Sequence, residues 1–176
     1  SVLITGASSG IGAACARLAA RRGAKVGMIA RRADVLERLC GELKAEGHDA
    51  TCEHADVCDW MALQTAIEQL QQRLGPCQTL IACAGIFRQT NGSRYAPAPA
   101  HAVFNVNLMG AVSAVGAVLP GMVARNEGRI AVISSLAAKL PRLPKTGVGH
   151  DDFAAPSGFP QSIGGVGRRG RGRLQL

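Results

Sequence analysis

The sequence predicts an α/β fold with a doubly wound, mostly parallel sheet. Two patterns predict it: short apolar segments alternate with stretches of helical periodicity, and a glycine-rich turn joins the first apolar segment to the first helix. Right-handed crossovers are expected between the strands. The alternation covers residues 1–148, which form one predicted domain. Residues 149–176 form a Gly/Arg-rich tail that is expected to be irregular and disordered.

Residues that start or stop regular structure bound most of these elements. Gly23 ends the first helix, Asp34 is expected to cap the second, and Gly75-Pro76 closes the third. The predicted strands are 2–4, 25–30, 49–54, 79–83 and 129–134. The predicted helices are 11–22, 34–46, 60–74 and 102–125. Because the first strand starts inside an apolar run, the chain is expected to be a fragment. Because residues 149–176 depart from the alternating pattern, the sheet is expected to be truncated after about the fifth strand.

Composition excludes several classes of protein. The 176 residues are 47% hydrophobic and 18% charged, which fits one soluble globular domain. The net charge of +8 is partly a property of the tail, since four arginines occupy the last nine positions. The longest apolar run, Leu108–Leu119, is too short for a membrane span, and no signal peptide is found. We therefore expect a cytoplasmic protein with no membrane partner.

The six cysteines show no C-x-x-C pair. Their scatter through an alternating α/β pattern favours reduced core thiols over disulfides or a metal site, so no metal ligand is predicted. The cysteines are Cys15, Cys40, Cys52, Cys58, Cys77 and Cys83.

A glycine-rich turn, residues 5–12 and here called the glycine loop, carries the predicted binding chemistry. It follows a strand and opens a helix, so backbone N–H groups and the helix N-terminus converge where a pyrophosphate would sit. The alternative is an ordinary strand-to-helix connection, which the T-G-x-x-x-G-I-G spacing disfavours. The candidate cofactor-binding residues of the loop are Gly6, Ser8, Ser9, Gly10, Ile11 and Gly12.

This loop resembles that of the short-chain dehydrogenase/reductase family, and the resemblance covers about 148 of the 176 residues. It continues through Asp56-Val57, Ala84-Gly85, Asn107 and Ser134-Ser135. The resemblance implies a Rossmann fold and an oxidoreductase that transfers hydride between NADP(H) and a small carbonyl or alcohol substrate. It also implies a homo-oligomer, which the shortened chain is not expected to complete.

The second strand ends in Ala30-Arg31-Arg32, which bears on the choice of cofactor. An acidic residue at this place binds the ribose 2′-hydroxyl of NAD, whereas arginine accommodates the 2′-phosphate of NADP. The resemblance implies that Arg31, with Arg32 beside it, binds the phosphate, so NADP(H) is preferred over NAD(H). The alternative is that both arginines are a solvated flank of the next helix.

Two further pairs of residues match family elements around the cofactor. Asp56-Val57 resembles the pair that borders the adenine; a lone Asp there would more often be a helix N-cap. Ala84-Gly85 resembles the second half of an N-N-A-G element, where small residues let the cofactor approach the strand end. The asparagine expected at position 82 is replaced by alanine.

The resemblance also assigns two candidate catalytic residues. Asn107 matches the asparagine that helps to organise a proton-relay water, although an asparagine in a helix is usually a surface or back-bonded residue. Ser135 matches the serine that orients the substrate oxygen; the alternative is a serine that caps a turn at a strand end.

The family's tyrosine and the lysine four residues later, which lowers the tyrosine pKa, are expected near positions 148–153. That segment reads Val-Gly-His-Asp-Asp-Phe and contains neither. Tyr95 and Lys145 lie elsewhere and are not assigned a catalytic role. His150 titrates near neutrality, but beside two aspartates it is better explained as a solvated histidine.

A shift of reading frame is one hypothesis for this departure. Codons for residues 164–171, read one nucleotide later, can encode a string that resembles the helix end expected in the family. The chain is therefore expected to show little or no turnover. A non-catalytic NADP-binding module is the alternative. The Arg/Gly tail has no aromatic residue for base stacking, so no nucleic-acid partner is predicted.

Overall fold

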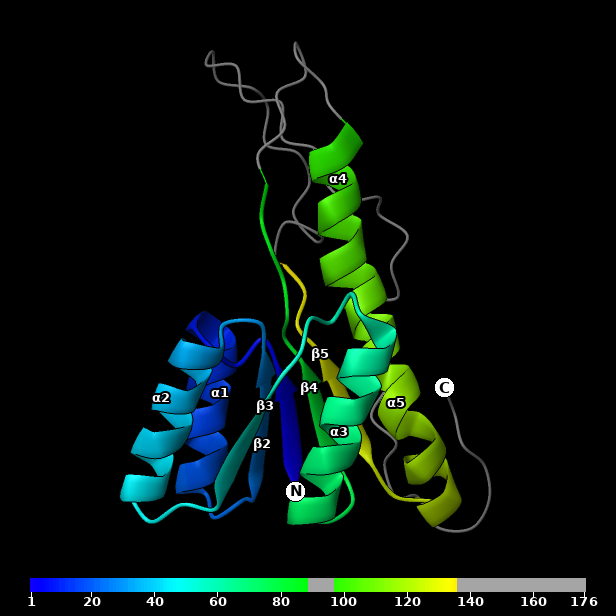
Figure 1. The fold of residues 1–176 in the computed structure, drawn as a ribbon. Helices are drawn as coiled ribbons and strands as arrows, with labels where there is room; N and C mark the ends of the chain where they lie inside the picture. The colour runs from blue at the N-terminus through cyan, green and yellow to red at the C-terminus, as the bar shows by residue number, and fades with distance from the viewer. Residues whose placement is uncertain (89–96, 136–176) are drawn as a thin grey trace.

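A five-stranded parallel sheet forms the centre of the protein. The computed structural model describes residues 1–88 and 97–135, and the tail, Tyr95, Lys145 and His150 lie outside them. The strands are β1 (Val2–Thr5), β2 (Val26–Ala30), β3 (Ala50–His54), β4 (Thr79–Ala82) and β5 (Arg129–Val132). They lie in the order β3-β2-β1-β4-β5, and every neighbouring pair is parallel (Figure 1). The predicted fold class is confirmed.

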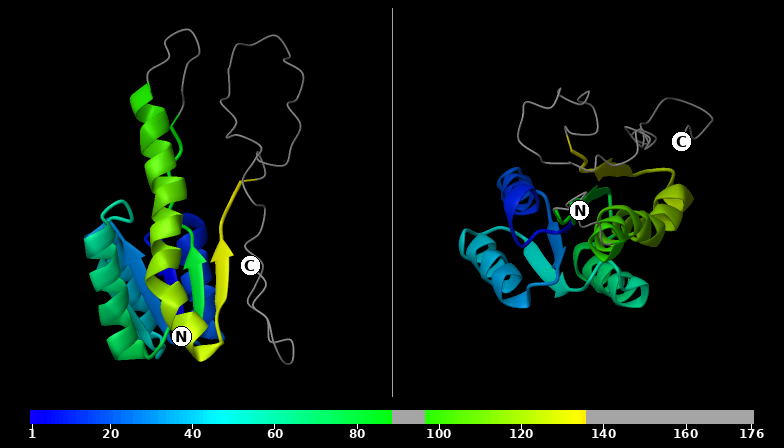
Figure 2. Two further views of the ribbon diagram at one scale, coloured as in Figure 1. Left: turned by 90° about the vertical axis from the view of Figure 1, so that its right-hand side faces the viewer. Right: turned by 90° about the horizontal axis from the view of Figure 1, so that it is seen from above.

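Helices cover both faces of this sheet. They are α1 (Gly10–Arg21), α2 (Ala33–Ala45), α3 (Trp60–Leu74), α4 (Pro97–Phe104) and α5 (Gly110–Arg125), with a π-helical turn, η2 (Asn105–Met109), between the last two. The views in Figure 2 show α1 and α2 on one side of the sheet and α3 and α5 on the other. The predicted helix 102–125 is thus longer at its start, and it contains a π-helical turn that its periodicity did not indicate.

Two predicted boundaries are wrong for local reasons. Asp34 does not cap α2, because the helix already begins at Ala33 and Arg32 occupies the N-cap position. The Asp34 carboxylate lies in the first turn instead, where it interacts favourably with the positive end of the helix dipole. The strand predicted to reach residue 134 ends at Val132. The predicted ends of α1 and α3 are confirmed by positive φ angles at Gly23 and Gly75.

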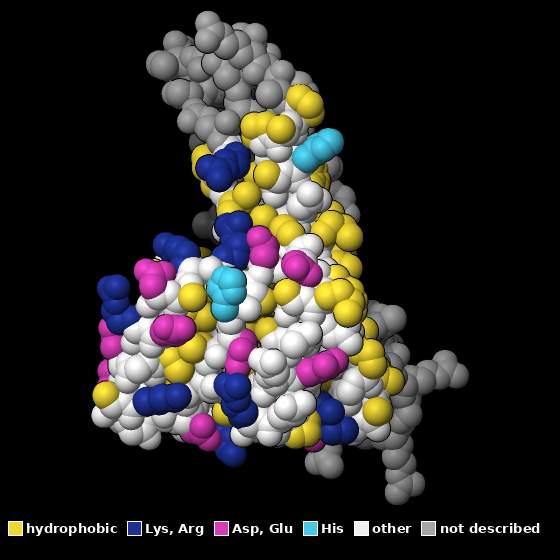
Figure 3. Space-filling view, in the orientation of Figure 1, with side chains coloured by type: hydrophobic (Ala, Val, Ile, Leu, Met, Phe, Trp, Pro, Cys, Tyr) yellow, Lys and Arg dark blue, Asp and Glu magenta, His cyan; other side chains and the backbone are white. Residues whose placement is uncertain are grey.

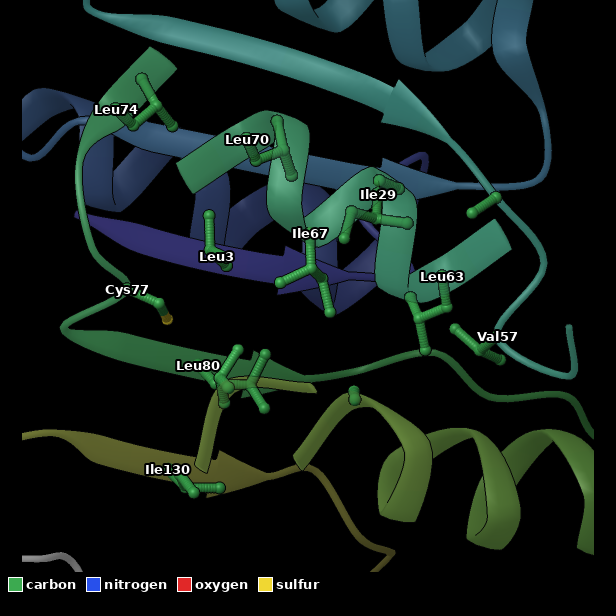
Figure 4. Close-up of a cluster of buried hydrophobic side chains, with 14 of the residues drawn as sticks. Leu3, Ile29, Val57, Leu63, Ile67, Leu70, Leu74, Cys77, Leu80 and Ile130 are labelled. Atoms are coloured by element: carbon green, nitrogen blue, oxygen red, sulfur yellow. The ribbon is translucent and has the colours of Figure 1, made fainter. Parts of the chain in front are cut away.

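Each face of the sheet has its own hydrophobic core. The larger core lies under α3 and α5 and contains the buried Leu3, Ile67, Leu70 and Leu80 (Figure 4). The second core lies under α1 and α2 and is built from smaller side chains, including Ala16 and Ala20. Because both faces are covered, the central strand β2 is apolar along its whole length, with five buried residues, whereas the edge strands β3 and β5 also carry polar residues.

The strand order reverses between β1 and β4, which makes the carboxyl edge of the sheet a switch point. The chain proceeds from β1 through β2 to β3 in one direction, then returns past β1 to place β4 and β5 on its other side. The connections that leave β1 and β4 therefore diverge to opposite faces. In open α/β sheets, ligands bind at this switch point, outside the carboxyl ends of the strands.

The continuous helical run from α4 to α5 bears on the prediction of no membrane partner. It spans Pro97–Arg125 and, by length and composition alone, is apolar enough to cross a membrane, which the shorter run 108–119 did not indicate. One face of α5 packs against α3 and β4 through Gly110, Ala114, Val118 and Met122, whereas α4 has no buried residue. Figure 3 shows hydrophobic side chains along α4 and α5, whereas charged side chains are mixed over the rest of that face.

The six thiols are free, but they are not all in the core. Cys40 and Cys77 are buried, Cys15, Cys52 and Cys83 are half-buried, and Cys58 is exposed. Desolvation raises the pKa of Cys77 to about 11 and, together with the neighbouring Cys40 thiol, raises that of Cys52 to about 12. These two thiols stay protonated at neutral pH and react slowly.

At Gly110, α5 lies close against Val57, so this glycine offers a test of the packing. A Cβ there would lie 2.5 Å from Cγ2 of Val57, and we expect Gly110→Ala to lower the free energy of unfolding by about 1–3 kcal/mol. Gly116→Ala is the matched control, because its Cβ would meet Trp60 at an ordinary 3.5 Å and alanine favours the helix. Urea unfolding of both variants measures the difference, and equal stabilities would contradict the proposed packing.

Candidate functional site

The glycine loop lies at the switch point, between β1 and the backbone that continues past β4. Gly6 has a φ of +71°, and a Cβ at this residue would lie 2.6 Å from the Cα of Ala84. A Cβ at Gly12 would overlap the Gly6 carbonyl oxygen. Glycine is therefore required twice, once for the left-handed backbone and close approach to β4, and once for packing α1 against the loop.

The remaining glycine of the loop borders open space. Gly10 has a φ of +55°, and no atom would lie within 4 Å of its Cβ. Ser9 occupies the N-cap position of α1, but its side chain does not cap the helix. The side chain of Ser9 therefore does not accept from the first N–H groups of α1. These groups lie beside the open space at Gly10.

Thr5 joins the loop to β4, and its role was missed by the sequence analysis. Its side chain is 1% exposed, and its hydroxyl oxygen accepts from the backbone N–H of Cys83 at 3.2 Å and of Ala84 at 3.3 Å. These N–H groups continue β4 past the end of its regular pairing. The sequence did offer a signal for this role: Thr5 is a polar residue at the end of a buried strand, and such a residue needs a hydrogen-bond partner.

Arg32 lies against the glycine loop. Its guanidinium donates to the hydroxyl oxygens of Ser8 at 3.1 Å and Ser9 at 2.6 Å. A cation and two hydroxyl groups therefore meet beside the N-terminus of α1. Arg32 is exposed and occupies the N-cap position of α2, as a solvated flank would, and it also bonds to the loop.

Arg31 is directed elsewhere. Its guanidinium lies 3.6 Å from the carboxylate of Asp56, and both side chains are about half exposed. Asp56 also accepts from the backbone N–H of Cys58 at 2.9 Å, which closes a local turn. Asp56 is not the N-cap of α3, because Asp59 fills that role by accepting from the backbone N–H of Ala62.

Two apolar residues of the predicted site have different surroundings. The Val57 side chain is buried in the larger core, against Gly110. Ile11 is 59% exposed in the first turn of α1, next to the open space at Gly10. The sequence places both in the predicted cofactor site, but only Ile11 presents its side chain to solvent there.

Asn107 clamps the backbone beyond β4. Its side-chain carbonyl accepts from the N–H of Ile86 at 2.8 Å, and its amide group donates to the carbonyl oxygen of Ile86 at 3.0 Å. Asn107 lies within the π-helical turn η2, and such turns often mark functional positions. Asn107 is exposed, as a surface residue would be, but it is not back-bonded within its helix, because its amide bonds to a different segment.

The remaining candidates flank this clamp. A Cβ at Gly85 would lie 3.6 Å from the side-chain oxygen of Asn107, which is an ordinary contact. The backbone approach that requires glycine is therefore the one between Gly6 and Ala84, not one at Gly85. Ser135 is exposed and follows β5, whose last backbone bond runs from the N–H of Ile133 to the carbonyl of Ala82 at 2.9 Å. Among residues 1–88 and 97–135, no group of three His, Cys, Asp or Glu side chains is arranged to hold a metal ion.

These observations fit the adenine–ribose–pyrophosphate part of a nicotinamide cofactor. The glycines leave a cradle that side chains would fill, the uncapped helix N-terminus favours an anion, and Arg32 brings a positive charge to the same place. An ordinary connection between strand and helix would require neither glycine at the close contacts nor an arginine bonded to the loop.

Comparison with known proteins agrees with this interpretation. A family model described as short chain dehydrogenase matches residues 1–146. Ketoacyl reductase HetN of Nostoc sp. is 37% identical over 138 residues, which are 78% of this chain and 48% of that protein. The chain therefore spans about half the length of this relative.

Solved structures show the same fold. Actinorhodin polyketide ketoreductase, determined as a variant with NADPH, has a TM-score of 0.77 at 31% identity, over 89% of this chain and 57% of that one. A 3-oxoacyl-(acyl-carrier protein) reductase from Brucella melitensis, with bound NAD, has a TM-score of 0.73 at 34% identity, over 79% and 54%. Nicotinamide cofactors with and without the 2′-phosphate are thus found on this fold.

The Thr5 hydroxyl tests how the site is held together. We expect Thr5→Val, which keeps the shape of the side chain, to lower the free energy of unfolding by about 1–3 kcal/mol because two N–H groups lose their acceptor. Thr51→Val is the control, since the Thr51 hydroxyl accepts only from the exposed Arg73 and should change stability by less than about 0.5 kcal/mol. Equal urea-unfolding curves for the two variants would show that the Thr5 bonds do not stabilise the site.

Proposed function

The chain belongs to the short chain dehydrogenase family, and we propose that it binds NADP(H) at the glycine loop, in preference to NAD(H). The observation that carries this proposal is the meeting of Arg32 with Ser8 and Ser9 beside the N-terminus of α1. A 2′-phosphate adds an anionic group with several acceptor oxygens, which a guanidinium and two hydroxyl groups can bind together.

The absence of an acid at the end of β2 supports the same preference. Ala30 stands where a carboxylate would bind a 2′-hydroxyl and repel a phosphate. The nearest carboxylate, Asp56, is partly neutralised by Arg31 at 3.6 Å. Arg31 is then available to a phosphate if it leaves Asp56, whereas Arg32 already lies at the loop.

The proposed reaction is the transfer of hydride between the nicotinamide and a carbonyl or alcohol group of a small molecule. Bound NADP(H) would supply or accept the hydride. Asn107 hydrogen-bonds to the backbone of Ile86 and so holds the segment that follows β4 in place beside the proposed cofactor site. Ser135, exposed after β5, is the proposed donor of a hydrogen bond that orients the substrate oxygen.

The proton donor is the missing part of this mechanism. The segment 148–153 contains neither the tyrosine nor the lysine that the family uses, so we propose that this chain turns over slowly or not at all. The same observation favours a second candidate function, a non-catalytic NADP-binding module. We also propose a cytoplasmic location and no nucleic-acid or membrane partner.

Substitution at the two arginines tests the cofactor preference. In calorimetric titrations, we expect Arg32→Ala to weaken NADPH binding about tenfold or more, because a charged hydrogen-bonding group is lost, while NADH binding changes little. Arg31→Asp should shift the preference toward NADH. Arg38→Ala, an exposed residue on α2, is the control. Equal affinity of the wild type for NADPH and NADH would remove the argument from both arginines.

Turnover separates the two candidate functions. A chain that binds NADPH but oxidises none of it with a panel of ketones and aldehydes acts as a binding module. Measurable oxidation of NADPH that falls at least tenfold in Ser135→Ala would instead support the oxidoreductase, with Ser135 in contact with the substrate. Spectrophotometry of NADPH at equal protein concentrations gives both results.

A further inference from the structure

Two of the six thiols lie together in the second core, on neighbouring elements. Cys40 belongs to α2, and Cys52 belongs to β3. Cys40 is buried in the second core, and Cys52 packs against that core from the strand. Neither residue is part of the proposed cofactor site, which lies at the carboxyl edge of the sheet.

The alternation of side chains along β3 turns Cys52 toward α2. The Cys40 thiol donates to the carbonyl oxygen of Ala50 at 3.6 Å, so the helix reaches the strand at this point. Ala50 is buried in the second core, and Cys52, two residues later, lies on the same face of the strand. Cys52 also pairs with Met28 of β2, which is buried in the same core. The two thiols therefore meet where α2 packs against β3 (Figure 1).

The surroundings of the Cys52 thiol agree with this contact. Desolvation, followed by the charge and the hydrogen bond of the Cys40 thiol, raises the pKa of Cys52 to about 12. Two sulfurs that share a hydrogen bond are close to the separation from which a disulfide forms, and rotation about χ1 of the two cysteines completes the approach. Geometry thus favours a covalent link between α2 and β3.

The two thiols differ in their access to solvent. Cys40 is 4% exposed, whereas Cys52 is half-buried and lies on the strand at the end of the sheet order. A small oxidant therefore reaches Cys52 first. The shielded Cys40 thiol is then placed to react with the oxidised Cys52 rather than with a second molecule of oxidant.

We propose that Cys40 and Cys52 form a modification site, at which a hydroperoxide oxidises the two thiols to a disulfide that joins α2 to β3. With hydrogen peroxide, the Cys52 sulfur attacks one oxygen, the O–O bond breaks, and a sulfenic acid and one water form. The Cys40 sulfur then attacks the Cys52 sulfur, the S–O bond breaks, and a second water leaves. The two thiols lose two electrons and two protons in total, which reduce the peroxide to water.

The environment of the pair determines how it responds. Because Cys52 stays protonated at neutral pH, the first step is slow, and the disulfide forms under sustained rather than brief exposure to peroxide. The link would hold β3, which has a neighbouring strand on one side only, to the helix that packs on it. Edge strands open locally more easily than central ones, so the disulfide is expected to stabilise this part of the fold. This site does not depend on cofactor binding.

Peptide mapping of the full chain after exposure to hydrogen peroxide tests the proposal. The remaining thiols are alkylated without prior reduction, and trypsin then places Cys40 on peptide 39–44 and Cys52, together with Cys58, on peptide 45–73. Cys58→Ser is the matched control, because it leaves Cys52 as the only thiol of the longer peptide. We expect the two peptides to be joined in wild type and in Cys58→Ser, to separate on reduction with dithiothreitol, and to be unlinked in Cys52→Ser.

Thermal unfolding measures the effect of the link. We expect oxidised wild type to unfold roughly 5–10 °C above its reduced form, and Cys40→Ala to show no such shift. The comparison of oxidised with reduced wild type needs no substitution, so it holds even if a variant fails to fold. Oxidation of Cys52 to a sulfinic acid with Cys40 still free, or a link between Cys15 and Cys83 in place of this one, would overturn the proposal. Equal unfolding temperatures of the two forms would contradict the stabilising role of the disulfide.

Discussion

The close contact between the end of β1 and the continuation of β4 is the constraint on which the site depends. Gly6 has no side chain to separate its backbone from Ala84, and the Thr5 hydroxyl accepts from both N–H groups that follow β4. Together they hold two segments that are 78 positions apart in sequence. The glycine loop, the switch point and the backbone clamped by Asn107 all take their positions from this contact.

The helix that carries Asn107 is adapted to the same contact. A regular α-helix through residues 97–125 would place successive residues 100° apart, whereas the π-helical turn at η2 inserts extra backbone and changes the direction of the side chains that follow. Asn107 bonds to Ile86 from within this turn, and Gly110, one turn later, lets α5 lie against Val57. The departure from helical periodicity thus connects the larger core to the switch point.

The arrangement of charge assigns different partners to the two arginines after β2. Arg31 lies beside Asp56, and Arg32 reaches back across the loop to Ser8 and Ser9. The family resemblance implied a phosphate contact for Arg31, whereas the geometry makes Arg32 the arginine already at the loop.

The sequence by itself determined the fold class, the sites of the elements and the glycine loop, because periodicity, helix-ending glycines and the T-G-x-x-x-G-I-G spacing are local properties. Its errors were local too: Asp34 was a plausible cap, but the helix begins one residue before it. Only the tertiary structure decided the partners of Thr5, Arg32 and Asn107 and the approach of the two thiols in the second core. Each of these depends on which strands become neighbours. The sequence around a residue does not indicate which distant segment its side chain will contact, or whether any segment will cover it.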